Sequence, residues 1–108
     1  MAKRLKRFDV YLIALDPTQG SEIKKTRPCV IVSPDEIHFL KTLIIAPLTT
    51  KIRHLPCRVI THFKGIQSEI ALDQLRAIDQ TRLIKKLGAI DKSTAKSVTN
   101  VLLEMFSL

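Results

Sequence analysis

Two polar segments of the sequence contain the side-chain types that bind and cleave a phosphodiester. The first precedes a predicted strand and contains Glu22, Lys24, Lys25 and Arg27. The second follows another predicted strand and contains Thr49, Thr50, Lys51, Arg53 and His54. An arginine guanidinium can donate two parallel hydrogen bonds to phosphate oxygens, and a threonine hydroxyl can donate a third. If the two strands are neighbours in a sheet, both segments face one groove.

Such a set can also cleave RNA without a metal ion, because RNA carries its own nucleophile in the 2′-hydroxyl group. The protein then supplies a base near that hydroxyl, a proton donor at the leaving 5′ oxygen, and positive charge near the phosphate oxygens. The same residues also have structural interpretations. Arg27 could form an ion pair with Glu22 at a strand end, and the Thr49 hydroxyl could bond to its own turn.

The elements that must position these segments are short strands. Apolar and β-branched runs predict strands at residues 10–15, 29–32, 42–46, 58–62, 69–72 and 75–78. Residues 82–90 are expected to be extended or mixed, with a kink at Gly88. We expect Pro28 at the start of the second strand and Pro47 at the end of the third, because proline has no N–H for a strand ladder.

A helix is expected at the end of the chain. Asp91 is a good N-cap, and apolar residues then recur at helical spacing at Ala95, Val98, Val101, Leu102 and Met105. We expect this face to pack on the sheet. The apolar residues off the stripe, which could cover a subunit contact, are Leu103, Phe106 and Leu108. Ser33 is expected to cap a single helical turn at residues 33–36. Short strands followed by one helix predict a mainly β fold, a small β-barrel with a C-terminal helix, in one domain spanning residues 1–108.

The charge of the chain is basic and unevenly distributed. There are 18 Lys and Arg residues against 10 Asp and Glu, a formal charge of +8. Residues 1–64 carry 12 basic and 5 acidic side chains, a net of +7, while residues 65–108 carry 6 and 5. Such a one-sided field attracts polyanions, which favours nucleic acid over an anionic membrane surface, with a solvated surface as the alternative. The longest apolar runs are too short to span a bilayer.

The cysteines and histidines predict neither a metal site nor a disulfide. Cys29 and Cys57 stand beside predicted strands, where free cysteine is common in reduced proteins. The three histidines, His38, His54 and His62, have no metal-ligand spacing. A Gly-rich phosphate loop is also missing, so no cofactor is expected. No signal peptide follows the basic start of the chain, so we expect a cytoplasmic protein.

Six short motifs occur in order along the chain. They are Asp9-Val10-Tyr11, Leu15-Asp16-Pro17-Thr18, Gly20-Ser21-Glu22, Arg27-Pro28 before a β-branched run, Pro47-Leu48-Thr49-Thr50, and Leu72-Asp73-Gln74-Leu75-Arg76-Ala77-Ile78-Asp79. Each motif is weak alone, but the six in this order resemble the MazF/PemK family of toxin endoribonucleases. The resemblance covers about residues 8–90 by motif and the rest by the terminal helix.

The resemblance implies a fold, an activity and partners. The fold would be an SH3-like barrel with a C-terminal helix, in a homodimer. The activity would be the metal-independent, sequence-specific cleavage of single-stranded RNA (mRNA), as an mRNA interferase, leaving a 2′,3′-cyclic phosphate and a 5′-hydroxyl. The chain would be the toxin of a type II toxin–antitoxin system, neutralised by a MazE-like antitoxin.

The resemblance also carries over site residues. The family's essential arginine and threonine match Arg27 and Thr49, and its Ser-Glu glutamate matches Glu22. We expect Arg27 to stabilise the phosphorane charge and to guide the proton to the leaving group, and Thr49 to anchor the phosphate. Glu22 would act as the base or would orient Arg27. The residues expected to contact RNA are Lys24, Lys25, Thr50, Lys51, Arg53, His54, Asp73, Gln74 and Arg76.

This chain departs from the family pattern in its first loop. Phe8 stands where a glycine is usual, and residues 23–25 make the loop after Glu22 bulkier and more basic. Ser21 and Ala71 replace a histidine and an arginine found in some members, so a mechanism that uses those residues cannot operate here. Two other functions stay open. One is a gyrase-poisoning toxin of the CcdB kind, and the other is an inactive homologue that only binds nucleic acid or an antitoxin.

Overall fold

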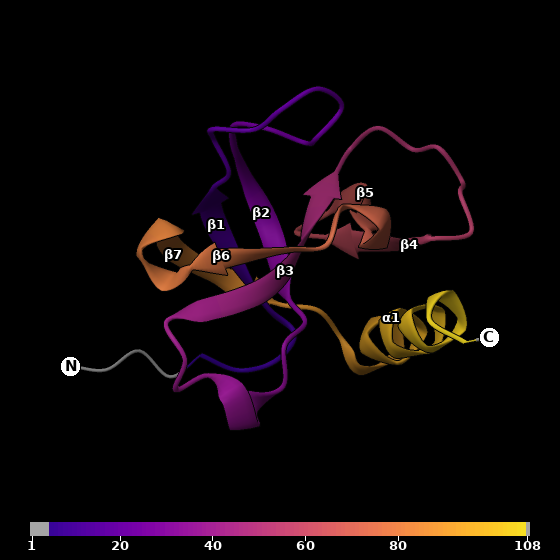
Figure 1. The fold of residues 1–108 in the computed structure, drawn as a ribbon. Coiled ribbons are helices and arrows are strands. Elements are labelled where there is room, and N and C mark those ends of the chain that lie inside the picture. The colour runs from indigo at the N-terminus through magenta and orange to yellow at the C-terminus, as the bar shows by residue number, and fades with distance from the viewer. Residues whose placement is uncertain (1–4, 108) are drawn as a thin grey trace.

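The protein is a curled, mostly β sheet with one helix at its C-terminal end (Figure 1). The computed structural model describes residues 5–107. The strands are β1 (Asp9–Ala14), β2 (Thr26–Ile31), β3 (Thr42–Thr49), β4 (Arg58–Phe63), β5 (Ile66–Ala71), β6 (Arg76–Asp79) and β7 (Leu83–Ala89). Short 3₁₀ turns are η1 (Asp35–Ile37), η2 (Leu72–Gln74) and η3 (Gln80–Arg82), and the helix is α1 (Lys92–Met105). The predicted mainly β fold with a C-terminal helix is confirmed.

Strand β3 organises the sheet, because it changes partner along its length. The strand order is β4-β5-β3-β2-β1-β7, and β6 pairs with the first half of β3. Residues 42–45 of β3 pair with β6, whereas residues 48–49 pair with β5. The sheet therefore curls around β3, and β2 lies beside β3 as the groove hypothesis requires. Figure 1 shows the loops that follow β1 and β3 on the same, upper side of the sheet.

Two apolar clusters stabilise the curl. One contains Val10, Val30, Leu48 and Ile70 and reaches Val98 on α1. The other is built from alternate residues of the same strands, and its members include Tyr11, Ile13, Cys29, Ile31, Ile45 and Ile78. Successive side chains of a strand point to opposite faces, so the apolar runs of β1, β2 and β3 supply both clusters. Strands buried on both faces explain why these segments are so rich in Ile, Leu and Val.

Two prolines lie inside strands, which corrects the predicted strand ends. Pro28 is the third residue of β2, and Pro47 is the sixth of β3. The β2–β3 ladder begins only at Cys29, so at Pro28 the strand is paired on the β1 side alone and tolerates a missing N–H. Pro47 stands where β3 has left β6 and not yet met β5, so on that side its missing N–H costs no ladder bond.

Helix α1 follows the sequence prediction closely. The Asp91 carboxylate accepts a hydrogen bond of 2.8 Å from the Thr94 N–H and thereby caps the helix. Of the predicted stripe, Val98 is fully buried, and Ala95, Val101 and Leu102 are half-buried against the first apolar cluster. Met105 is 38% exposed, so the packed face ends one turn before the helix does. Leu108 lies outside the described residues.

The turn after β2 differs from its prediction. Ser33 does not cap η1, whose first flanking residue is Pro34 and which has no side-chain cap. The buried Ser33 hydroxyl instead accepts a hydrogen bond of 3.2 Å from the Ile44 N–H and so connects the turn to β3. Lys64 and Gly65 form the predicted turn between β4 and β5, both with positive φ. In the described part of the chain, no helix has the length and apolar character needed to cross a membrane.

Candidate functional site

The adjoining ends of β2 and β3 carry Arg27 and Thr49. The ladder between these strands ends at the antiparallel pair of Cys29 with Pro47, and Arg27 and Thr49 lie two residues away from it, at the same end of the two strands. Thr49 is in turn paired with Glu69 of β5. Three functional groups therefore lie on three neighbouring strands at the end where the two loops join them.

The Arg27 side chain is fixed at its base and open at its tip. Its Nε donates a hydrogen bond of 3.2 Å to the carbonyl oxygen of Lys24. Within residues 5–107 its two terminal nitrogens have no hydrogen-bond or ion-pair partner. An arginine held in this way presents its two outer N–H groups as a ready donor pair for an anion with two oxygens.

Arg76 and Arg27 both act electrostatically on one buried thiol, that of Cys29. Burial raises the pKa of the Cys29 thiol to about 12, and the positive charges of Arg76 and Arg27 oppose that rise. Cys29 is therefore a protonated core residue, and both described cysteines are free, as predicted. Arg76 is not wholly available for RNA, because its Nη1 donates a hydrogen bond of 3.0 Å to the carbonyl oxygen of Leu15.

The two threonines at the end of β3 have different surroundings. Thr49 is half-buried, and its Oγ1 accepts a hydrogen bond of 3.2 Å from the Lys51 N–H. The Thr49 hydroxyl therefore does bond to its own turn, as the structural interpretation supposed. In that bond the oxygen is the acceptor, so the hydroxyl can still donate its proton in a hydrogen bond to a phosphate. Thr50 is exposed and lines a pocket together with Arg27.

Four of the predicted site residues meet in one cavity of about 320 Å³, here called the polar pocket. Its lining is Leu15, Ser21, Glu22, Ile23, Pro47, Asp73, Gln74, Leu75 and Arg76. It joins the β1–β2 loop (residues 15–25) to η2, and the Gln74 side-chain oxygen accepts a hydrogen bond of 3.3 Å from the Ile23 N–H. The pocket thus brings Glu22 together with Asp73, Gln74 and Arg76, which follow it by about 50 residues in the chain.

Glu22 does not pair with Arg27. Its Oε1 accepts a short hydrogen bond of 2.6 Å from the Gln19 N–H, which closes a turn at the tip of the β1–β2 loop. Among the ion pairs of residues 5–107, none contains Glu22 or Arg27. The interpretation of the two residues as a structural ion pair was therefore wrong, because the loop turns Glu22 into its own tip. Within the described residues, its other oxygen has no hydrogen-bond or ion-pair partner, and Glu22 lines the polar pocket.

A second cavity, here called the apolar pocket, contains Arg27 and Thr50, neither of which lines the polar pocket. It measures about 210 Å³ and is lined by Arg27, Pro28, Leu48, Thr50, Phe63, Lys64, Ile66, Ser68 and Leu87. Phe63 lies against Gly88, where even a Cβ atom would come within 3.4 Å of its ring. An aromatic ring with cationic neighbours is the kind of surface on which a nucleobase stacks.

The β3–β4 loop (residues 50–57) is anchored by a residue that sequence reasoning missed. The carboxylate of Glu69 accepts hydrogen bonds from the N–H groups of Arg53 (3.1 Å) and His54 (2.8 Å). Glu69 is completely buried, although the next residue, Ile70, points to the apolar cluster on the other face. The loop itself therefore covers Glu69. The only sequence signal was an acidic residue inside an otherwise apolar strand.

Arg58 is the second missed residue, and it links two carboxylates. It donates hydrogen bonds of 2.6 and 3.2 Å to Asp73 and one of 3.3 Å to Glu69. The hydrogen bond to Asp73 and the two negative charges raise the pKa of Arg58. Burial alone would raise the pKa of Glu69, but the two loop N–H groups and Arg58 outweigh burial and hold it below its ordinary value. Asp73 was expected to contact RNA, yet Arg58 already occupies both of its oxygens.

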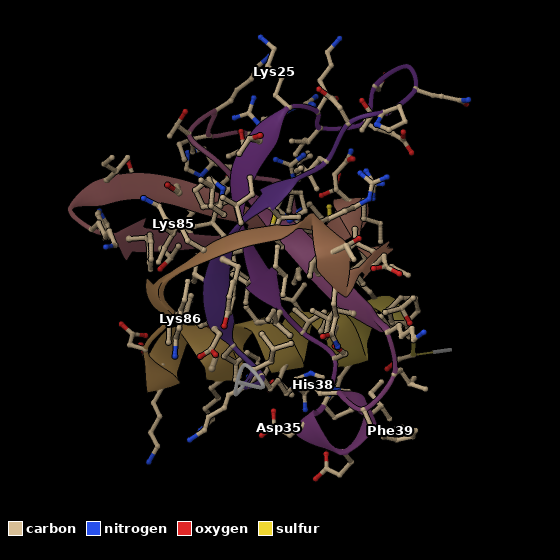
Figure 2. All side chains as sticks on the ribbon, turned by 90° about the vertical axis from the view of Figure 1, so that its left-hand side faces the viewer. Lys25, Asp35, His38, Phe39, Lys85 and Lys86 are labelled. Atoms are coloured by element: carbon tan, nitrogen blue, oxygen red, sulfur yellow. The ribbon has the colours of Figure 1, made fainter. Side chains whose placement is uncertain are left out.

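The remaining predicted RNA contacts are exposed basic side chains. Lys24, Lys25, Lys51, Arg53 and His54 all point to solvent. Figure 2 shows Lys25 at the top of the molecule, at the opposite end from Phe39 and Asp35. Lys25 and His54 both have positive φ, at 72° and 54°. In the described residues, no three His, Cys, Asp or Glu side chains cluster as metal ligands do.

The fold and site together define a class: a small curled β sheet with one terminal helix, carrying a cationic site at the ends of two adjacent strands. Within that class the chain belongs to the family of PemK-like, MazF-like toxins of type II toxin–antitoxin systems, whose family model matches residues 6–106. It is 34% identical over 107 residues to an endoribonuclease MazF of Staphylococcus saprophyticus. That match covers 91% of this chain and 88% of the relative.

Solved structures share the fold. The MazF crystal structure from Deinococcus radiodurans matches with a TM-score of 0.86 and 17% identity, covering 99% of this chain and all of that one. The Mycobacterium tuberculosis toxin MazF-mt6 matches with a TM-score of 0.78 and 21% identity, over 93% and 97% of the two chains. An endoribonuclease from a mycobacterial species, solved with its cognate antitoxin, also has a TM-score of 0.78, with 20% identity over 93% and 92%.

Proposed function

We propose that this protein is a sequence-specific endoribonuclease that cuts single-stranded RNA without a metal ion. The observation that carries the proposal is the Arg27 guanidinium at the end of β2, which is held through Nε while its two terminal nitrogens have no partner within residues 5–107. That geometry suits the equatorial oxygens of a phosphate that gains charge during transfer. Family membership and the name of the Staphylococcus relative support the same assignment.

The proposed reaction conserves atoms within the RNA. The 2′-oxygen attacks the neighbouring phosphorus and passes its proton to a base, the bond from phosphorus to the 5′-oxygen breaks, and a proton guided by Arg27 is transferred to that oxygen. The products are a 2′,3′-cyclic phosphate and a 5′-hydroxyl. Arg27 stabilises the phosphorane charge, and Thr49 donates a hydrogen bond to the phosphate. Glu22, with one carboxylate oxygen free, is the candidate base for the 2′-hydroxyl proton.

Substrate contacts follow from the two pockets. We place the scissile phosphate between Arg27 and Thr49, and one neighbouring base in the apolar pocket against Phe63. The polar pocket presents Gln74 and Arg76 to the other side of the phosphate. The exposed basic residues of both loops, Lys24, Lys25, Lys51, Arg53 and His54, contact the RNA backbone. Thr50 adds a hydroxyl at the rim.

The Arg27→Ala variant tests this proposal. We expect purified wild-type protein to cleave a mixed RNA pool in EDTA, and Arg27→Ala to lose about 100- to 1,000-fold in rate, as when a preorganised donor to an oxyanion is removed. Arg82→Ala is the matched control, because Arg82 binds the carbonyl oxygens of Ala14 and Asp16 and is absent from both pockets. Undiminished cleavage by Arg27→Ala would overturn the mechanism. DNA breaks that depend on gyrase would instead favour a CcdB-like toxin.

The partners belong to the same proposal. We infer that a MazE-like antitoxin neutralises the protein, since solved relatives of the same fold are complexes with their antitoxins. We also infer a homodimer in the cytoplasm, where the RNA substrate is found. Large apolar side chains are exposed on α1 and near η1, and the most exposed are Phe39 (83%), Phe106 (73%) and Leu103 (66%). Such exposure on a small protein is typical of surfaces that bind another chain.

A further inference from the structure

We propose that Glu69 is a positioning residue for RNA binding, acting through the main chain of the β3–β4 loop. Glu69 is neither exposed nor a lining residue of either pocket, so it does not touch the substrate. It determines where Arg53 and His54 stand. This inference rests on the endoribonuclease function proposed above and adds a residue to it that the ordered motifs of the family do not include.

The first support is the geometry of the carboxylate. Each of its two oxygens binds a different residue of the loop. Oε1 accepts a hydrogen bond from the Arg53 N–H, and Oε2 accepts one from the His54 N–H. Arg58 donates a third hydrogen bond to Oε1 and closes the cluster from the β4 side. A fully buried carboxylate with three donors has no remaining freedom to turn. The two loop residues are consequently fixed relative to β5, and not merely to each other.

The second support is the backbone of His54. Its φ of 54° lies in the left-handed region, which a residue with a side chain adopts at a cost. The 2.8 Å hydrogen bond from the His54 N–H to Glu69 offsets that cost. Strained backbone that is held by its surroundings is typical of sites where a loop must present groups in one arrangement.

The third support is the place of Glu69 on β5, directly opposite Thr49 on β3. Thr49 is directly paired with Glu69, so the anchor of the loop stands beside the residue that binds the phosphate. Arg58 extends the connection to Asp73, which lines the polar pocket. This charge cluster, in which Glu69 and Arg58 are buried and Asp73 is exposed, thus connects the β3–β4 loop to η2 on both sides of the proposed phosphate position.

A positioning role predicts a specific kinetic signature. Arg53 and His54 act on RNA binding, whereas Arg27 and Thr49 act on the reacting phosphate. Loosening the loop should therefore raise KM for a short RNA substrate by about tenfold, which corresponds to one or two weakened contacts, while kcat stays within about twofold. A residue that mattered only for folding would lower the active fraction and so reduce kcat at unchanged KM.

The experiment compares Glu69→Gln and Glu69→Asp with the exposed-site control Glu36→Gln. Glutamine keeps the shape but offers a single acceptor oxygen to three donors. Aspartate keeps the charge beside Arg58, so the interior stays balanced and the chain folds, but it is one methylene too short to reach both loop N–H groups. We expect both variants to show the raised KM and the control to match wild type. Unchanged KM in a folded Glu69→Asp would overturn the proposal.

Amide hydrogen exchange supplies a readout that does not depend on cleavage. In wild type, the Arg53 and His54 amides should exchange slowly for a loop, because a buried carboxylate accepts both. Their protection should fall at least about tenfold in both Glu69 variants and stay unchanged in Glu36→Gln. Fast exchange at both amides of the wild type would also overturn the proposal. If wild type showed slow exchange at these amides but did not cleave RNA, the proposed endoribonuclease function would be wrong. The attachment of the loop to Glu69 would still be supported.

Discussion

The two loops that surround the proposed phosphate site are built on the same local device but are anchored differently. Each contains a basic residue in the left-handed conformation, Lys25 in the β1–β2 loop and His54 in the β3–β4 loop. In each, a carboxylate accepts a hydrogen bond from the N–H of that residue: Asp16 accepts from Lys25 at 3.0 Å, and Glu69 accepts from His54 at 2.8 Å. Asp16 is exposed and belongs to its own loop, whereas Glu69 is buried and belongs to a distant strand.

The difference teaches how one site can combine a fixed side with an adaptable side. The β1–β2 loop is closed mostly by bonds within itself, such as that between Gln19 and Glu22. Arg76 and Arg82 hold the base of this loop, because they donate hydrogen bonds of 3.0 and 2.7 Å to the carbonyl oxygens of Leu15 and Asp16. Within the described residues, the tip of the loop is bonded to η2 through the 3.3 Å hydrogen bond from the Ile23 N–H to Gln74. The β3–β4 loop is attached to the sheet through a buried charge cluster. We therefore expect the tip of the β1–β2 loop, which carries Glu22, to change conformation when substrate binds. The β3–β4 loop should keep its conformation.

The largest effect that tests this comparison is on stability. In Glu69→Ala, Arg58 would lose one of its two carboxylate partners. The N–H groups of Arg53 and His54 would lose their acceptor. We expect it to lower the free energy of unfolding by about 3 kcal/mol, the usual cost of breaking a buried charged network. Asp16→Ala should cost about 1 kcal/mol or less, because water can replace an exposed acceptor. Urea unfolding of both variants measures the difference, and equal losses would show that the loops are anchored alike.

A smaller effect concerns pH. The pKa values of Glu69 and Asp73 lie below their ordinary values of 4.5 and 3.8, because hydrogen bonds and Arg58 favour the charged forms. A group whose folded pKa is lowered contributes stability above its ordinary pKa and loses it as pH falls through the lowered value. We expect the unfolding midpoint in urea to be flat from pH 7 to about 5 and to fall below about pH 4.5. In Glu69→Gln the fall should be shallower, and an unaltered acid slope there would contradict the assignment.

The smallest effect tests the feature that the loops share. Replacing Lys25 or His54 by glycine keeps the backbone N–H and its carboxylate acceptor while removing the steric cost of positive φ. We expect each substitution to raise the free energy of unfolding by about 0.5–1 kcal/mol. Thermal melts of both variants against wild type would measure the gain. A gain at only one position would mean that the two left-handed residues are not equivalent in strain.

The sequence predicted most of the fold because its signals were local. The apolar runs located all the strands of the sheet core, and Asp91 with the residues after it located the helix. The strand ends were less predictable, because Pro28 and Pro47 are tolerated only where a neighbouring strand is missing. That condition depends on pairing between distant segments. It is not a property of the proline or of the residues beside it.

The site was predictable in part for the same reason. Arg27 and Thr49 lie at the adjoining ends of β2 and β3, so the adjacency of the two strands was enough to predict that they lie at one end of the sheet. Glu69 and Arg58 were missed, because the pattern of β5 and β4 reveals which face a side chain takes but not that a loop folds over it. Asp73 was identified as a site residue, yet its neighbour Arg58 could not be foreseen from spacing alone. Long-range contacts between charged groups carry little signal in one sequence.

Strand β7 has a further consequence that concerns the protein at high concentration. It is the last strand in the sheet order, so beyond its pairing with β1 it presents an open row of peptide groups. An open strand edge invites a strand of another molecule and so begins aggregation. Figure 2 shows Lys85 and Lys86 along this strand. Positive charges there repel a second copy of the same edge, and this repulsion opposes edge-to-edge aggregation at high protein concentration.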